Sequence, residues 1–245
     1  MARIFIAAVS ILLLSLIVTC NGENDDRADF VFVNRGDVFT LDPGRMSWLT
    51  DMQAAYCLYE GLVRWDPKDF SIEEAAAESI TLSEDQTTYL FTLRSDAKWS
   101  NGAPVTAYDF KYAWMRLLTP DTASDYSGFL FSVKGASDFW KWRTDKLQAQ
   151  EFVTLQEIQS KFDEVVSICA LDERHLEVTL EQPVPYFLDQ IALAVCGPVY
   201  RPAVEGWNLN AVEWQQVNGY NSNNIIDYNI YRDGILYDQT TSNVY

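Results

Sequence analysis

Residues 89–120 read YLFTLRSDAKWSNGAPVTAYDFKYAWMRLLTP, and this stretch decides the fold. Residues 89–93 carry the two-residue alternation that is typical of a half-buried strand. The sequence Ser-Asn-Gly at 100–102 predicts a tight turn, because Asn and Gly tolerate a positive φ. Thr106 is typical of a helix N-cap, and Asp109 stands where a capping box places its acid. The stretch therefore predicts strand, turn and helix in succession.

The predicted helix has one apolar face. Phe110, Trp114, Leu117 and Leu118 recur at the spacing that brings side chains to one side of a helix. Pro120 is expected to end it, since proline cannot continue a helix. The spacing of the apolar residues in the predicted strand and helix would by itself fit any α+β domain.

The wording of the stretch is more specific than its periodicity. Residues 93–120 resemble the signature region of family 5 of the extracellular solute-binding proteins, which includes oligopeptide- and dipeptide-binding proteins. Three further segments resemble that family in the same order, namely TLDP at 40–43, LYEGL at 58–62 and HLEVTLEQPVPYF at 175–187. The resemblance runs from Phe30 to Pro202 and fades from about Glu205.

The resemblance implies an α+β fold that is the N-terminal part of a two-lobed, type II periplasmic-binding-protein-like architecture. It implies mixed β-sheets with peripheral helices, and the second lobe is expected to be missing. The implied organisation is a first segment of lobe I at 29–61, an inserted subdomain at 62–182, a return segment at 183–210, and a tail unlike the family at 211–245. That tail predicts a hairpin around Arg232-Asp233-Gly234 and resembles a fibronectin type III hairpin. The gene is thus expected to be truncated or chimeric.

Composition limits the class of function. Hydrophobic residues make up 48% and aromatic residues 14% of the chain, so a globular core is expected. The formal net charge of −17 disfavours nucleic acid as a partner.

The N-terminus resembles an export signal. Residues 1–19 are almost wholly apolar after Arg3, and Cys20 follows Ile-Val-Thr in the manner of a bacterial lipobox. Cys20 is therefore the predicted lipidation site, residues 20–28 a polar tether, and the location an exported lipoprotein at the membrane, in the periplasm or on the cell surface. An ordinary cleaved secretory peptide is the alternative.

Three cysteines remain, Cys57, Cys169 and Cys196, and pairs 169–196 or 57–196 are as acceptable as three inert buried thiols. His175 is the only histidine, and it is expected to be a surface or paired residue. A metal site, a cofactor and an enzymatic function are not predicted, because no catalytic set or metal spacing is present.

The other predicted elements are less specific. They are strands at 30–34, 62–65, 163–170 and 175–180, a turn at 40–44, and helices at 51–62, 154–162 and 187–193. The helix at 51–62 is expected to bury Ala54, Ala55, Leu58 and Leu62. No element is predicted for the acidic, alanine-rich residues 71–79. Residues 121–150 are expected to be loop-rich, with aromatic side chains that form either a packed cluster or an aromatic box for a ligand, and the resemblance implies a short helix in the segment that contains residues 139–142.

The function implied by the resemblance is capture of a peptide or other small solute for an ABC permease, by a chain expected to be a monomer. Asn34, Arg35 and Gly36 are the candidate ligand-binding residues, because the segment after the first strand lines the cleft in that family. Trp99, Tyr112 and Trp114 are interpreted as core. With one lobe missing, weak binding is expected. The alternatives are a nickel, haem or oligosaccharide carrier of the same family, or a cell-surface scaffold.

Overall fold

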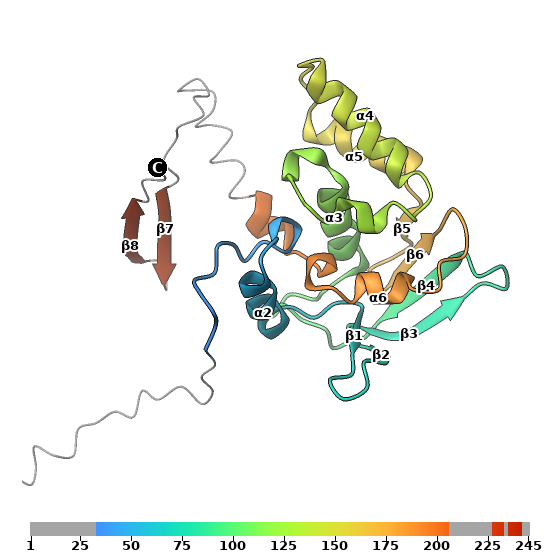
Figure 1. Ribbon diagram of the computed structural model, residues 1–245, viewed down its shortest axis with the longest axis horizontal. Helices are drawn as coiled ribbons and strands as arrows, with labels where there is room; N and C mark the ends of the chain where they lie inside the picture. The colour runs from blue at the N-terminus through green and yellow to red at the C-terminus, as the bar shows by residue number, and fades with distance from the viewer. Residues whose placement is uncertain (1–32, 206–226, 233–234, 242–245) are drawn as a thin grey trace, which may run out of the picture. The chain divides into compact units, whose positions relative to one another are not determined.

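The computed structural model describes residues 33–205, 227–232 and 235–241 (Figure 1). Residues up to Asp37 and residues from Val38 onward form separate units, and each is described by itself. The helices are η1 (Pro43–Arg45), α2 (Leu49–Leu58), α3 (Ala107–Leu118), η2 (Pro120–Thr122), η3 (Ser127–Leu130), α4 (Ala136–Gln148), α5 (Leu155–Val165), α6 (Phe187–Ile191) and η4 (Ala194–Cys196), where η marks a 3-10 helix. The strands are β1 (Val63–Trp65), β2 (Ile72–Glu74), β3 (Ala77–Leu82), β4 (Thr88–Leu93), β5 (Ile168–Ala170), β6 (His175–Thr179), β7 (Asp227–Arg232) and β8 (Ile235–Thr241). The α+β class is confirmed.

A four-stranded sheet with the order β3-β4-β6-β5 is the centre of the second unit. Phe91 pairs with Ile80 on one side and with Leu176 on the other, so one row of large side chains crosses the sheet. Along β4, Tyr89, Phe91 and Leu93 are buried while the residues between them are partly exposed, which confirms the predicted alternation. The sheet therefore has one face on the core and one toward solvent.

Every strand pair in the described ranges is antiparallel, so the mixed sheets that the resemblance implied are not found there. For the pairs β3–β4 and β5–β6 the reason is local. Short turns join β3 to β4 and β5 to β6, and a short turn can connect only antiparallel neighbours.

The predicted turn and helix of the signature stretch are confirmed. Gly102 has a φ of 85°, and the Trp99 N–H donates to the carbonyl oxygen of Ala103 at 2.8 Å. The N–H and the hydroxyl of Thr106 both donate to the carboxylate of Asp109, at 2.8 and 2.9 Å. These local bonds begin α3 at the residue after the cap.

Helix α3 supplies the middle of the core. Its predicted apolar face is confirmed, because Phe110, Trp114, Leu117 and Leu118 are completely buried. The helix contacts β5 and β6 as well as η1, η3 and η4, so it joins the sheet to segments from both ends of the unit (Figure 1). The indole N–H of Trp114 donates to the carbonyl oxygen of Cys196 at 2.9 Å.

The helix predicted at 51–62 is wrong at both ends. α2 begins at Leu49 and ends at Leu58, where Tyr59 turns into an extended conformation. Ala54 and Ala55 are buried as predicted, but Leu58 is exposed and Leu62 is buried outside the helix. The chain must extend before Leu62 so that β1 can pair with β2, and this tertiary requirement overrides helical periodicity.

Other boundaries also shift. Residues 163–165, expected in a strand, belong to α5, and the strand begins only at Ile168. β2 and the start of β3 occupy the stretch for which no element was predicted. The strand predicted at 30–34 lies largely outside the described residues, and Val33 and Asn34 are in no strand.

The segment expected to be loop-rich, 121–150, contains the thirteen-residue helix α4. Phe139 is fully buried and meets the ring of Phe162 edge-on at 5.3 Å, while Phe131 and Trp140 form a second edge contact. Phe139 thus packs between α4 and α5, and Trp140 packs against Phe131 at the end of η3, so these aromatic side chains form a packed cluster rather than an aromatic box. The aromatic content of residues 121–150 did not predict the full length of α4. Phe139, which α4 buries, packs against α5, and α5 lies later in the sequence.

The tail forms the predicted hairpin, in which β7 pairs with β8. The predicted turn residues Asp233 and Gly234 lie outside the described residues. No helix within the described ranges is both long enough and apolar enough to cross a membrane.

Candidate functional site

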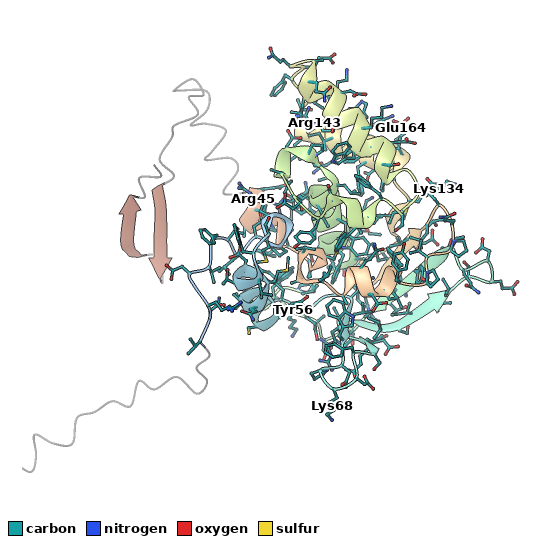
Figure 2. All side chains as sticks on the ribbon, in the orientation of Figure 1. Arg45, Tyr56, Lys68, Lys134, Arg143 and Glu164 are labelled. Carbon is teal, nitrogen blue, oxygen red and sulfur yellow. The ribbon has the colours of Figure 1, made fainter. Side chains whose placement is uncertain are left out.

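The segment that leads into α2 and α2 itself carry several exposed large apolar side chains. Figure 2 labels Arg45 and Tyr56 in this part of the chain. We define the α2 face by the exposed large apolar side chains of residues 38–56, which are Val38, Phe39, Leu41, Trp48, Leu49 and Tyr56. Leu58 is also exposed, but it is nine residues from Leu49 and therefore lies on the other side of α2. Phe39 is 74% and Trp48 63% exposed, and their ring centroids are 6.0 Å apart. Such a concentration of exposed apolar surface is typical of a binding surface.

Hydrogen bonds and an ion pair hold the backbone of this segment in place. Asp42 caps η1 by accepting from the Gly44 N–H at 3.2 Å, and its two carboxylate oxygens accept from the guanidinium of Arg116 at 2.9 and 2.6 Å. Arg116 is the basic residue in the last turn of α3. Asp42 therefore ties the turn after Leu41 to α3, whose residues Phe110, Trp114, Leu117 and Leu118 are completely buried.

Two more hydrogen bonds fix the flanks of the face. The hydroxyl of Ser47 donates to the carboxylate of Asp125 at 2.6 Å, which links the turn to the loop before η3. Asp51, which is completely buried, accepts from the N–H of Phe39 at 2.8 Å. Phe39 and Trp48 are thus exposed side chains on a backbone that is held at several points.

The α2 face can bury apolar groups but offers little charge. An apolar side chain laid against it removes exposed hydrocarbon and aromatic surface from water, at about 25 cal/mol per Å². Aromatic rings also contribute a large contact area at a small entropic cost. The face is therefore suited to solutes with apolar groups.

The candidate residues Asn34, Arg35 and Gly36 lie in the first unit, in a segment with bends and no regular structure. Arg35 donates its N–H to the side-chain oxygen of Asn34 at 3.0 Å. Arg35 and Gly36 are exposed and Asn34 is half-buried. Their role in binding stays a prediction.

Sequence reasoning missed Trp48 and Leu49. The available signal was a pair of large apolar residues at the start of a helix that buries only Asp51, Met52, Ala54 and Ala55. Of the residues interpreted as core, Tyr112 and Trp114 are buried, whereas Trp99 is half-exposed and packs on the ring of Tyr200.

His175 is paired at the surface, as predicted. Its Nδ1 lies 2.8 Å from the carboxylate of Asp172, three residues earlier. The bonds from the backbone of Arg174 and from the His175 side chain lower the pKa of Asp172. In the described part of the chain, no cluster of metal-ligating side chains occurs.

Cys57, Cys169 and Cys196 are free thiols in the structure. Only Cys196 is buried, so the prediction of three buried thiols is wrong for the other two, and neither predicted disulfide pair is formed. Cys169 lies on β5 between Ile168, which is buried, and Ala170, which is half-buried, and Cys169 itself is exposed. Burial raises the pKa of the Cys196 thiol to about 12.

The thiols should therefore differ in reactivity. Iodoacetamide at pH 8 is expected to modify Cys57 and Cys169 in the folded protein and to leave Cys196 intact, because thiolate is the reactive form. Peptide mass mapping after alkylation measures each site. Unfolding in guanidinium should expose Cys196 to the same reagent; early labelling of Cys196 under native conditions would contradict the described packing.

Comparison with known proteins identifies the family. The model for bacterial extracellular solute-binding proteins, family 5, matches residues 71–226, which extends past Glu205, where the motif resemblance fades. The chain belongs to this family. The resemblance inferred from residues 93–120 is thereby confirmed.

Individual relatives bind different solutes according to their names. The chain is 35% identical over 69% of its length to the probable deoxycholate-binding periplasmic protein of Escherichia coli. It is 34% identical over 74% of its length to the dipeptide-binding protein DppE of Bacillus subtilis. The solved structure of Haemophilus influenzae OppA in complex with the peptide RPPGFSPFR covers 68% of the chain, with 32% identity and a TM-score of 0.57.

These relatives are much longer than the matched region. The chain spans 29% of the length of both curated relatives and of the Haemophilus structure. The fold of family 5 is thus shown for a part of the two-lobed architecture, and the domain boundaries within it stay predictions.

Proposed function

We propose that this chain is part of the extracytoplasmic solute-binding component of an ABC importer, which captures peptides for a membrane permease. The observation that carries the proposal is the α2 face, an exposed and firmly anchored apolar surface in a member of family 5. The relatives named for dipeptides and for a bound peptide support peptides as the solute class. Binding of this kind requires no chemical step, so the protein is proposed to act without catalysis.

The α2 face would form one side of the solute site. Phe39 and Trp48 would cover apolar side chains of the peptide, while the anchored backbone beneath them keeps their positions fixed. A preorganised surface loses less entropy on binding. Because these side chains are open to solvent and no facing segment encloses them among the described residues, this chain by itself is expected to bind weakly, with fast exchange.

An amphipathic non-peptide solute is the second candidate. The Escherichia coli relative named for deoxycholate favours it, and so does the face itself, since aromatic and aliphatic side chains suit a flat apolar molecule. Nickel, haem and oligosaccharides, which the sequence left open, have no such support among the described residues.

Location and anchoring belong to the same proposal. Export is supported by family membership and by the apolar N-terminal segment before Cys20. Lipidation of Cys20 would keep a monomeric binding protein beside its permease, and stable anchoring needs more than one acyl chain. Residues 1–32, which include Cys20, lie outside the described residues.

The solute site can be tested by replacing Phe39 with alanine. We expect Phe39→Ala to weaken binding of short apolar peptides by roughly tenfold, because a large exposed ring that is covered by ligand contributes about 1.5 kcal/mol or more. Shifts of amide NMR signals during titration with trileucine measure weak affinity and map the contact residues.

Phe152→Ala is the matched control, since Phe152 is 89% exposed and lies in the loop between α4 and α5. It should leave the affinity unchanged. Stronger binding of deoxycholate than of trileucine at the same face would favour the second candidate. Equal losses in the two variants, or shifts that avoid residues 38–56 for both solutes, would refute the assignment of the face.

A further inference from the structure

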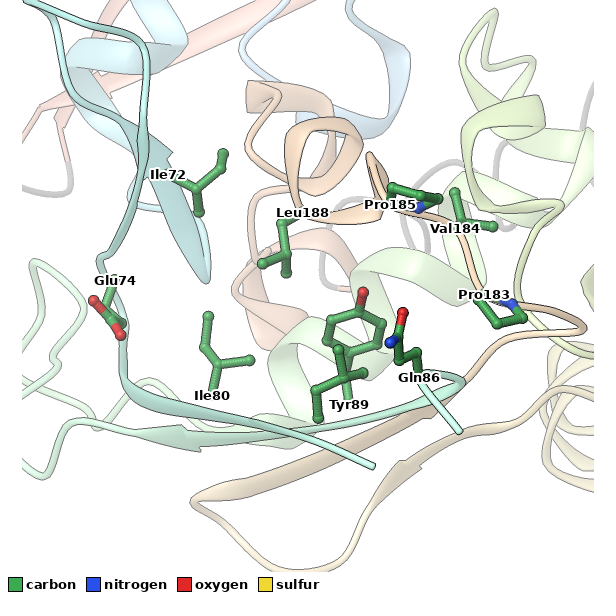
Figure 3. Close-up of a pocket in the computed structure, with 10 residues that line it drawn as sticks. Ile72, Glu74, Ile80, Gln86, Tyr89, Pro183, Val184, Pro185 and Leu188 are labelled. Carbon is green, nitrogen blue, oxygen red and sulfur yellow. The ribbon is translucent and has the colours of Figure 1, made fainter. Parts of the chain in front are cut away.

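A separate cavity lies beside the central sheet, between β2, β3 and the segment that leads into α6 (Figure 3). Its volume is about 510 Å³, which is within the range of small-molecule sites. Most of its lining is apolar and comes from Ile72, Ile80, Leu82, Val184 and Leu188. The cavity shares no lining residue with the α2 face.

Tyr89 places a hydroxyl group in this cavity. Its side chain is only 6% exposed, and its ring is held against Phe187 and Phe91 at centroid distances of 5.1 and 6.1 Å. The ring is buried, but the hydroxyl is not among the buried side-chain atoms without a hydrogen-bond partner in the described residues, so it is open to the cavity and available to a ligand. Figure 3 shows the hydroxyl directed into the cavity. Burial raises the pKa of Tyr89, so the group remains a proton donor at neutral pH.

Two other polar side chains limit what could bind there. Gln86 lies next to the Tyr89 hydroxyl, and Glu74 lies on the opposite side of the cavity (Figure 3). Gln86 has a φ of 59° in the turn that joins β3 to β4, where its backbone N–H donates to the carbonyl oxygen of Ser83 at 2.9 Å. Within the described ranges Glu74 forms no ion pair, and its charge would repel an anion.

We propose that this cavity is a binding site for a small, uncharged molecule with an apolar body and a carboxamide group. The carbonyl oxygen would accept from the Tyr89 hydroxyl, the amide of Gln86 would take the remaining hydrogen bond, and the apolar body would lie between Ile80 and Leu188. An equivalent carboxylate is disfavoured by the charge of Glu74 in the lining.

Two isosteric probes test the chemistry, cyclohexanecarboxamide and cyclohexanecarboxylate. Titration of the whole chain, followed by amide NMR, should shift signals of Gln86 and Leu188 with the amide and not with the carboxylate. Tyr89→Phe should weaken amide binding by roughly fivefold, the effect of one lost hydrogen bond. Denaturation curves should show that this variant remains folded.

A pair of tryptophan variants separates blocking of the cavity from general disruption. Leu82→Trp should abolish amide binding by filling the cavity, whereas Thr81→Trp, one residue earlier in β3 and on the opposite face of the sheet, should not. Phe39→Ala should leave amide binding intact, which distinguishes this site from the α2 face. Equal affinity for the two probes, unchanged affinity in Tyr89→Phe, or binding by Leu82→Trp would each overturn the proposal.

Discussion

Replacement of Gly135 with alanine is expected to lower the free energy of unfolding by at least about 4 kcal/mol. Gly135 precedes α4 with a φ of 79°, and a Cβ atom there would lie 1.7 Å from the carbonyl oxygen of Val165 and 2.7 Å from its carbonyl carbon. Both atoms are backbone, so no side-chain rotation relieves the overlap. The total stability of a domain is commonly about 5–15 kcal/mol, so most of it could be lost.

Hydrogen bonds to neighbouring segments hold the backbone at Lys134 and Gly135 in place. Its N–H donates to Glu181 at 3.0 Å, and the neighbouring Lys134 bonds to Thr179 and to Ser167 at 2.9 Å each. Moving Gly135 away from Val165 would break these bonds between α4 and the sheet. The close approach therefore holds the helical pair α4–α5 against β5 and β6.

Urea denaturation measures the change, as a shift of the midpoint at constant m value. Gly128→Ala is the control, because a Cβ at Gly128 meets no atom within 4 Å. The control should change stability by less than about 1 kcal/mol. If the two variants shift the midpoint equally, the packing described at Gly135 is wrong.

Replacement of Arg116 with methionine should have the second-largest effect, a loss of about 2–4 kcal/mol. Methionine keeps the length and apolar stem of the side chain but leaves the carboxylate of Asp42 without its bidentate partner. Arg116 and Asp42 are 13% and 25% exposed, so the loss should be smaller than for a pair that is entirely removed from water. Thermal or urea unfolding measures it.

The matched control is Arg94→Met. Arg94 pairs with Glu60 at 2.7 Å, but the side chains are 39% and 44% exposed, so its loss should cost less than about 1 kcal/mol. Arg116→Met should in addition displace the amide NMR signals of Phe39 and Trp48, because it releases the turn under the α2 face. A stability loss without any change in those signals would mean that the ion pair does not position the face.

Several features follow from sequence because they are settled within a few residues. The capping boxes of α3 and α5, Thr106 with Asp109 and Thr154 with Glu157, are bonds between residues three apart. The turn at Gly102 and the surface pair of His175 with Asp172 are equally local. The motif between residues 93 and 120 also identified the family, since its wording is far more specific than its periodicity.

The candidate sites required the tertiary structure. Asp42 and Arg116 are 74 residues apart in sequence, and the cavity at Tyr89 is assembled from segments that begin at Ile72 and end at Leu188. Leu58 fits a helical core position by spacing but is exposed, while Trp48 is left on the surface although it is large and apolar. Burial depends on which distant segment covers a residue, and periodicity describes only the side of an element on which the residue lies. Sequence therefore determined the local turns, the helix caps and the family, and only packing decided the bounds of several elements and which apolar and polar groups remain available to a ligand.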